Sequence, residues 1–280
     1  MTRKDFLKLL ALTLGGLTMP LLANNTKRAP AFFVGHGSPM NAIENNTFTK
    51  SLKKLGSSIE KPKAILVISA HWLSPHEAIS LHDEDEELIY DMFGFPDALY
   101  NIKYPAPNAD FLVPNIQTIL TSLKVEERSL DHGAWSVLLH LYPKADIPVM
   151  QLAINSNLTM KEHFEMGRKI RILREHGVMI IGSGNVTHNL QDIKAQKDAL
   201  VTPWAQEFDS FVKNAIVKQD FDALIDYKDR QPYAQHAHPT AEHYIPLLYV
   251  AGSTYSDDKS QFIYEGFEHG SLSMRNWLLR

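Results

Sequence analysis

The sequence contains no cysteine. This absence excludes disulfide bonds, metal sites built on thiolates and cysteine nucleophiles. A transition metal in this protein would have to be bound by histidine, aspartate or glutamate, and the chain carries 13 histidines. The methionines are scattered along the chain, so a thioether metal site is not expected.

Excess positive charge, linkers and internal repeats are absent as well. The formal net charge is −4 and there is no basic stripe, so we expect no nucleic-acid partner. No Pro/Gly/Ser-rich linker and no repeat divides the 280 residues, which predicts a single domain. The proportions of hydrophobic and charged residues, 44% and 21%, are typical of a globular protein.

A long hydrophobic run is also missing, because the apolar stretch over residues 9–22 is too short to span a bilayer comfortably. It follows a basic start over residues 1–8, which is the layout of an export signal. We therefore predict that residues 1–23 are removed and that the protein is periplasmic, with no stable membrane insertion afterwards. The alternative is an amphipathic N-terminal helix on a cytoplasmic protein.

Three short apolar runs, each followed by a histidine, are the main structural signal. They occupy residues 31–34, 64–68 and 178–181. Their β-branched and aliphatic composition predicts strands buried on both faces. His36, His71 and His188 come just after these runs. In open α/β sheets ligands bind at the carboxyl ends of the strands. If the strands are parallel neighbours, the three histidines meet at one edge of the sheet.

The remaining patterns predict further elements around these strands. We expect helices over residues 47–55, 109–123, 131–143, 159–176, 202–215 and 242–250, and strands over residues 147–154 and 262–267. Residues 73–108 form a long irregular segment rich in aromatic side chains. Such a segment either packs on the sheet edge or covers an aromatic substrate.

Ten of the 13 histidines fall into two groups. Six of them lie on expected surfaces or helix faces, where we interpret them as solvated or structural: His76, His82, His140, His163, His176 and His269. The three histidines that follow strands, together with His243 near the start of a helix, predict a metal site. Imidazole ligands without thiolates suit Zn²⁺, Fe²⁺ or Mn²⁺. Such a site either activates water or binds a substrate beside O₂, and the residue types alone do not choose between these reactions.

Five short motifs occur in a fixed order along the chain. They are Phe33-Val34-Gly35-His36-Gly37-Ser38-Pro39-Met40, Ser69-Ala70-His71-Trp72, Asp131-His132-Gly133-Ala134-Trp135, Ser183-Gly184-Asn185-Val186-Thr187-His188-Asn189-Leu190 and Pro239-Thr240-Ala241-Glu242-His243-Tyr244-Ile245-Pro246. In this order they resemble the class III extradiol ring-cleavage dioxygenases, in particular the 4,5-DOPA dioxygenase branch. The resemblance covers essentially everything after about Pro30, so residues 24–280 are expected to form the catalytic domain.

The resemblance implies a single α/β domain with a central mixed, largely parallel sheet flanked by helices and a metal at the strand ends. It implies one divalent ion per chain, Zn²⁺ or Fe²⁺, held by His36, His71, His188 and His243. The wider class holds Fe²⁺ with two histidines and a glutamate, which makes Glu242 the alternative to His243. His188 is either a ligand or a proton carrier, and His132 is expected to face the substrate as a second catalytic residue.

The predicted function is therefore a metal-dependent dioxygenase that cleaves a catechol-type ring with O₂. Two alternatives remain from the residue types: a zinc hydrolase that uses metal-activated water, and an exported protein that binds metal or catecholate. The aromatic segment favours a flat ring as substrate, and the absence of an HExxH helix argues against the commonest zinc proteases.

Overall fold

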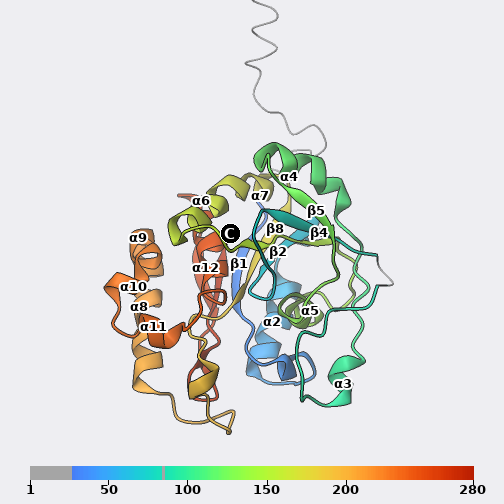
Figure 1. The fold of residues 1–280 in the computed structure, drawn as a ribbon. Helices are drawn as coiled ribbons and strands as arrows, with labels where there is room; N and C mark the ends of the chain where they lie inside the picture. Colours follow the sequence, from blue (N-terminus) through green and yellow to red (C-terminus); the bar gives the residue numbers. More distant parts are fainter. Residues whose placement is uncertain (1–26, 84–85) are drawn as a thin grey trace, which may run out of the picture.

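A six-stranded sheet forms the centre of the computed structural model, which describes residues 27–83 and 86–280 (Figure 1). Its strands follow the order β6 (Val149–Gln151), β2 (Ala64–Ser69), β8 (Val178–Gly184), β1 (Ala31–Gly35), β12 (Asn276–Leu279) and β9 (Ser260–Tyr264). Strands β6, β2, β8 and β1 are parallel, whereas β12 is antiparallel to both β1 and β9. The predicted mixed, largely parallel α/β sheet is confirmed.

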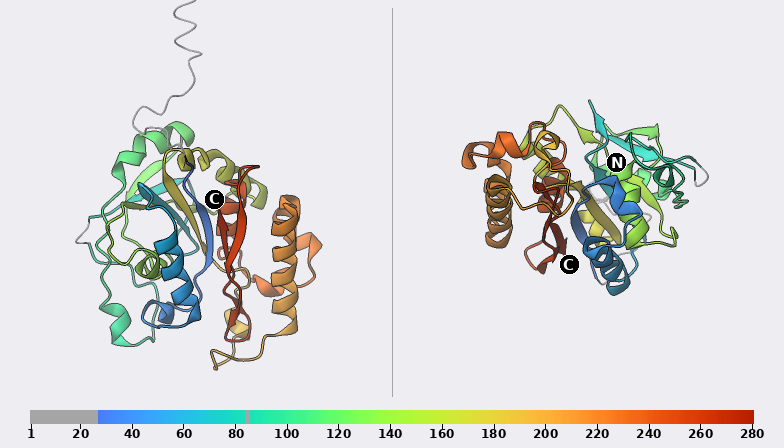
Figure 2. Two further views of the ribbon diagram at one scale, coloured as in Figure 1. Left: turned by 180° about the vertical axis from the view of Figure 1, so that it is seen from behind. Right: turned by 90° about the horizontal axis from the view of Figure 1, so that it is seen from below.

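Every residue of β1, β2 and β8 is buried, which explains their continuous apolar composition. Successive side chains alternate between the two faces of the sheet. Ile65 and Val67 contribute to the core shared with α2 (Thr47–Ser58) and α5 (His132–Leu141). Leu66 and Ile68 contribute to the core shared with α6 (Met160–Ile170) and α12 (Ile245–Gly252). Helices therefore cover both faces, as the turned views show (Figure 2).

Proline decides two helix boundaries that the periodicity placed wrongly. Residues 109–123 do not form one helix: a short 3₁₀ turn, η2 (Asp110–Leu112), is followed by α4 (Val113–Ile119), with Pro114 in the first turn of α4. Likewise α12 begins only at Ile245, so that Pro246 also lies in a first turn. Proline is tolerated there because the first backbone N–H groups of a helix have no partner within the helix.

The helix predicted over residues 159–176 begins as expected but ends early. Thr159 caps α6, and its hydroxyl and the Glu162 carboxylate satisfy each other's backbone N–H groups. The helix ends at Ile170, and α7 (Ile172–Glu175) follows it. The helix expected at residues 202–215 is α8 (Pro203–Lys218), with Thr202 at the position before its first turn and Pro203 as its first residue.

The segment 73–108 is more regular than expected. It contains β3 (Leu73–Ser74), β4 (Ala78–Leu81) and α3 (Asp97–Tyr100). Strand β4 pairs with β5 (Lys124–Glu127), and β3 pairs with β7 (Ile154–Asn155), which is the last part of the strand predicted over residues 147–154. The strand predicted over 262–267 is divided between β9 and β10 (Phe267–Glu268), and β12 was not predicted.

The other elements are short: β11 (Leu272–Ser273), α9 (Phe221–Ile225), α10 (Tyr227–Arg230), α11 (Ala234–Ala237) and the 3₁₀ turns η1 (Pro39–Ala42) and η3 (Leu190–Asp192). Among the described helices, none combines the length and the apolar composition needed to cross a membrane. The predicted export signal, residues 1–23, lies outside the described residues.

Candidate metal centre

Three of the predicted metal-binding histidines meet at the carboxyl edge of the sheet. His36 directly follows β1, and His71 lies two residues beyond β2. Their Nε2 atoms are 3.2 Å apart. The His243 ring, which comes from the segment just before α12, has its centroid 5.4 Å from that of His36 and 5.1 Å from that of His71. One nitrogen from each of the three rings lies within 4.8 Å of the other two.

Glycine in β8 allows the third histidine to come this close. The backbone N–H of Asn185 donates to the carbonyl of His243 at 2.9 Å. A Cβ atom added to Gly184 would lie only 2.1 Å from that same carbonyl oxygen. A larger residue at this position would therefore push the His243 segment away from the sheet. Glycine at position 184 of the 183–190 motif is thus required for close packing.

The hydrogen bonds of Ser183 fix the tautomer of His36. The Ser183 hydroxyl has one proton, which it donates to the carbonyl oxygen of Gly133 at 2.6 Å. The same hydroxyl oxygen is 3.0 Å from His36 Nδ1, so it must accept the Nδ1 proton. His36 Nε2 then carries a lone pair that faces the other two rings. Burial, with the neighbouring histidines adding to it, holds the pKa of His36 well below its usual value and keeps the ring neutral.

Carboxylates fix the other two rings in the same way. His71 Nδ1 donates to Asp91 at 2.9 Å, and His243 Nδ1 donates to Glu242 at 3.2 Å. Burial also holds the pKa of His243 well below its usual value. His243 Nε2 is buried and has no hydrogen-bond partner among the described residues. With their Nδ1 protons committed, His36 Nε2 and His71 Nε2 face each other without a proton between them, and together with His243 they form a donor set that fits a divalent transition metal.

His188 lies beside this group rather than within it. Its ring stacks on His243, with the centroids 3.4 Å apart and the planes 4° from parallel. One of its nitrogens lies within 4.8 Å of ligand atoms of His243 and Glu242, but the four predicted ligands do not form one such group. Burial, the largest cause, lowers the pKa of His188 to about 4.

His132 also reaches the site, held by a carboxylate that the sequence analysis assigned no role. Asp131 caps α5, so His132 is its first residue. His132 Nδ1 donates to Asp91 at 2.7 Å, and its ring lies 3.8 Å from that of His71. Desolvation alone would raise the pKa of Asp91, but the hydrogen bonds from His132 and His71 hold it well below its usual value. Asp91 thus bridges a predicted metal ligand and a predicted catalytic residue. The sequence feature that could have indicated this role is its position in the aromatic segment, directly after Tyr90.

A buried polar network supports the His71 loop from below. The Ser69 hydroxyl donates to Asp131 Oδ1 at 2.7 Å, and the Gln151 amide donates to Asp131 Oδ2 at 2.7 Å. The backbone N–H of His71 in turn donates to the Ser69 hydroxyl at 3.2 Å. Asp131 is fully buried, so these bonds fix the positions of both His71 and His132. Neither Ser69 nor Gln151 was predicted to support the site.

The histidines open into a cavity of about 500 Å³. Three side chains of the aromatic segment, Met92, Phe93 and Phe95, line the cavity, and so do Leu190 and Ile193. The segment therefore covers the site instead of only packing on the sheet edge. A cavity of this size, with mostly apolar walls and polar groups at one end, suits a small flat molecule.

The remaining histidines differ partly from expectation. His82, His140, His163 and His176 are buried, and of these His140 and His163 lie on helices α5 and α6. Their contacts suit the structural role: His140 Nε2 is 2.7 Å from the carbonyl of Asn41, and His163 Nδ1 is 3.3 Å from the hydroxyl of Tyr249. His76 pairs with Glu126 away from the site. His269 lines the cavity, which the sequence analysis did not anticipate.

The fold and this group of histidines match a known family of ring-opening enzymes. The model of the family described as the catalytic LigB subunit of aromatic ring-opening dioxygenase matches residues 30–278. The chain belongs to this family, which confirms the resemblance inferred from the five motifs. It is an oxidoreductase of the extradiol ring-cleaving dioxygenase class.

Individual relatives agree with this assignment. The chain is 42% identical over 257 residues to a protein of Escherichia coli K12 named 4,5-DOPA dioxygenase extradiol, covering 89% of this chain and 94% of that protein. A Beta vulgaris protein of the same name is 38% identical over 253 residues, covering 86% and 93% of the two chains. The crystal structure of an uncharacterized E. coli K12 protein matches with a TM-score of 0.78 and 38% identity, covering 90% of this chain and 100% of that one.

Proposed function

We propose that this protein is a metal-dependent enzyme that opens a catechol-type ring with O₂, and that His36, His71 and His243 hold the metal. The observation that carries the proposal is the convergence of three Nε2 atoms whose Nδ1 protons are all committed to hydrogen bonds. Family membership favours this reaction over the zinc hydrolase and the binding protein that the residue types left open.

Bound Fe²⁺ would supply the electron transfer that lets O₂ react with a catecholate, whereas Zn²⁺ has no redox activity. The protein's own contribution is to position the substrate and to manage its protons. The catechol oxygens would lie against the three histidines, and the ring would lie against apolar side chains that line the cavity, among them Phe95 and Ile193. These apolar walls keep water away from the ring.

Two histidines are suited to take and return the catechol protons. Because His132 donates its Nδ1 proton to Asp91, its Nε2 carries a lone pair that can accept a proton, and the Asp91 carboxylate stabilises the cation that forms. His188 is neutral because burial lowers its pKa, and its ring stacks on His243, within reach of a catechol held at the three histidines. We therefore propose His188 and His132 as the acid/base pair, with His188 a neighbour of the metal ligands.

The proposal is tested by loading the purified protein with metal under anaerobic conditions. Protein reconstituted with Fe²⁺ should consume one O₂ for each ring opened when DOPA or 4-methylcatechol is supplied, as measured with an oxygen electrode and by the absorbance of the product. The same protein loaded with Zn²⁺ should bind the catechol and consume no O₂. Absence of O₂ uptake by the Fe²⁺-loaded protein with every catechol tried would contradict the proposal.

We also propose that residues 1–23 direct export and that residues 24–280 are the mature catalytic domain in the periplasm. In support, the family match begins at residue 30, beyond the predicted signal. N-terminal sequencing of protein from fractionated cells of the native host should find a start near Asn24 in the periplasmic fraction. Recovery of only full-length protein from the cytoplasm would show that the segment is not a cleaved signal.

A further inference from the structure

The walls of the cavity carry an uneven set of charges. Two carboxylates, Asp91 and Glu242, line it, but among the described residues that border it there is no lysine and no arginine. Asp91 accepts hydrogen bonds from His71 and His132, and Glu242 accepts one from His243. A substrate substituent in this cavity therefore meets negative charge, apolar side chains or neutral polar groups.

The lysines closest in sequence to the lining residue Ile193 do not change this balance. Lys194 pairs with Asp192 at 3.4 Å. Lys197 pairs with Glu44 and, at 3.1 Å, with Glu268. Neither lysine side chain lines the cavity, and each has its own carboxylate partner.

The path of the substituent follows from the position of the histidines. With the catechol oxygens at His36, His71 and His243, a group on the far side of the ring extends toward the cavity mouth. Phe93 and Leu190 line the cavity and are also 91% and 60% exposed, so they stand at this mouth. The substituent accordingly passes apolar side chains on its way to solvent.

We propose, building on the function above, that this cavity selects catechols whose substituent is uncharged or cationic and offers a substituent carboxylate no binding partner. An ammonium group is attracted by the two lining carboxylates, and a carboxylate is repelled by them. A substrate such as DOPA, which carries both groups, is then accepted despite its carboxylate and not because of it.

Four compounds with the same two-carbon link to the ring test this by varying the two charges independently. They are 4-ethylcatechol, dopamine, 3,4-dihydroxyphenylpropanoate and DOPA. Dissociation constants are measured anaerobically on the Zn²⁺-loaded protein, and kcat/KM on the Fe²⁺-loaded protein. Histidines also line the cavity, so both are measured at pH 8, above the ordinary pKa of an imidazole.

We expect the carboxylate to weaken binding by roughly threefold to tenfold in both pairs, dopamine against DOPA and 4-ethylcatechol against the propanoate. The penalty should shrink as the ionic strength rises, because the substituent lies near the solvent-open mouth, where salt screens its interaction with the carboxylates. A carboxylate that leaves affinity unchanged or improves it in either pair overturns the proposal. If the Fe²⁺-loaded protein opens none of the four rings, the proposed function itself fails, which is a separate result.

A pair of variants at the mouth gives an independent check. Leu190→Lys places one cation beside the substituent, and Leu190→Met is the matched neutral control. The lysine variant should bind the propanoate at least threefold more tightly than the methionine variant does. The affinities of the two variants for 4-ethylcatechol should differ by less than twofold. Equal propanoate affinity in the two variants would show that charge at this mouth does not govern selection.

Discussion

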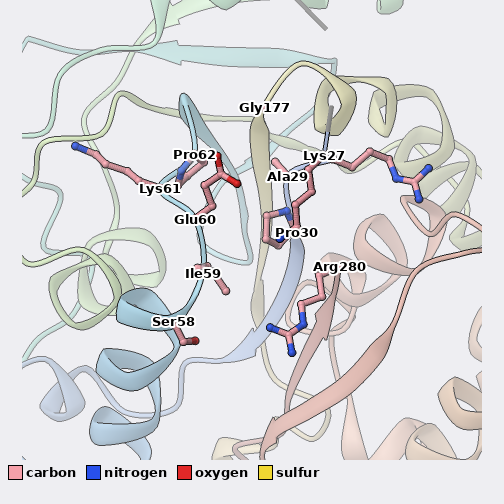
Figure 3. A pocket seen from close by; sticks show the side chains of 11 residues that line it. Lys27, Ala29, Pro30, Ser58, Ile59, Glu60, Lys61, Pro62, Gly177 and Arg280 are labelled. Carbon is pink, nitrogen blue, oxygen red and sulfur yellow. The ribbon is translucent and has the colours of Figure 1, made fainter. Parts of the chain in front are cut away.

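The two edges of the central sheet both carry charged or polar side chains beside a hollow, but only one of them is organised as a site. At the carboxyl edge, three histidines point at one another inside a cavity of about 500 Å³. At the amino edge, Lys27, Lys61 and Arg280 surround a hollow of about 80 Å³ near Gly177 (Figure 3). Lys61 extends away from Arg280 and pairs with Asp146 at 2.8 Å.

The difference lies in how the polar groups are satisfied. At the amino edge each charge has its own partner or solvent, and the side chain of Lys61 is 54% exposed. At the carboxyl edge each histidine uses Nδ1 for a neighbour; His36 and His71 turn their Nε2 atoms toward each other, and His243 Nε2 is buried without a partner among the described residues. Unsatisfied buried groups are costly, so such an arrangement indicates a missing ligand, whereas a collection of exposed charges does not.

The largest effect should come from removing one of the three central histidines. His36→Ala or His71→Ala should abolish stoichiometric metal binding and lower ring cleavage by more than the roughly 10–100-fold that loss of an outer partner causes, because each removes a ligand. Metal content by mass spectrometry and the circular dichroism spectrum are the measurements. Full metal content in both variants would mean that the site is elsewhere.

His188→Gln should have the next largest effect on turnover. If His188 handles protons, the variant keeps its metal and its catechol affinity and loses about 10²–10⁴-fold in kcat. If His188 is a ligand, metal affinity falls and added metal restores part of the activity. The stacking of His188 on His243 leads us to expect the first result. Normal metal content with unchanged cleavage would refute both roles.

Asp91→Asn should weaken metal binding or cleavage by about 10–100-fold, since one amide cannot hold His71 and His132 as a carboxylate does. Asp97→Asn is the control: it removes a carboxylate from the same segment, and Asp97 is exposed at the start of α3. Both metal affinity and kcat are measured. Equal results for the two variants would remove Asp91 from the site.

His163 is a buried histidine outside the site, so changing it tests whether burial alone, without neighbouring histidines, affects metal binding. Burial is the main cause that lowers the pKa of His163 to about 4. Between pH 6.5 and 4 the unfolded chain therefore binds a proton that the folded protein does not, and stability falls as the pH falls through this window. His163→Gln should remove up to about 3 kcal/mol of this pH dependence, at about 1.4 kcal/mol per pKa unit. Urea denaturation at several pH values measures it, and metal binding at pH 7.5 should not change.

The smallest effect should come from the amino edge. Lys61→Ala breaks an exposed ion pair, so the free energy of unfolding should change by less than about 0.5 kcal/mol. Metal content and kcat should remain those of the unchanged protein. A clear loss of ring cleavage in this variant would mean that the amino edge also contributes to the reaction.

The sequence by itself determined the strands that carry the site and the histidines at their ends. Continuous apolar runs at 31–34, 64–68 and 178–181 have no other stable place than the buried middle of a parallel sheet. The direction of parallel strands then sends His36 and His71 to the same edge. The order of the five motifs was enough to indicate the family, and each motif carries one histidine of the site.

Only the tertiary structure decided which polar groups work together. Asp91 is 41 residues from His132, and Ser183 is 147 residues from His36, so no local pattern connects them. The placement of His188 against His243 depends on how the segment before α12 packs over Gly184, not on the strand that precedes His188. The absence of a lysine or arginine among the described residues of the cavity wall is likewise a property of packing, because lysines follow closely in the sequence at positions 194 and 197 but pair elsewhere. Local composition favours a buried strand, whereas the pairing of strands and of hydrogen-bond partners depends on distances in space that the chain reaches only when folded.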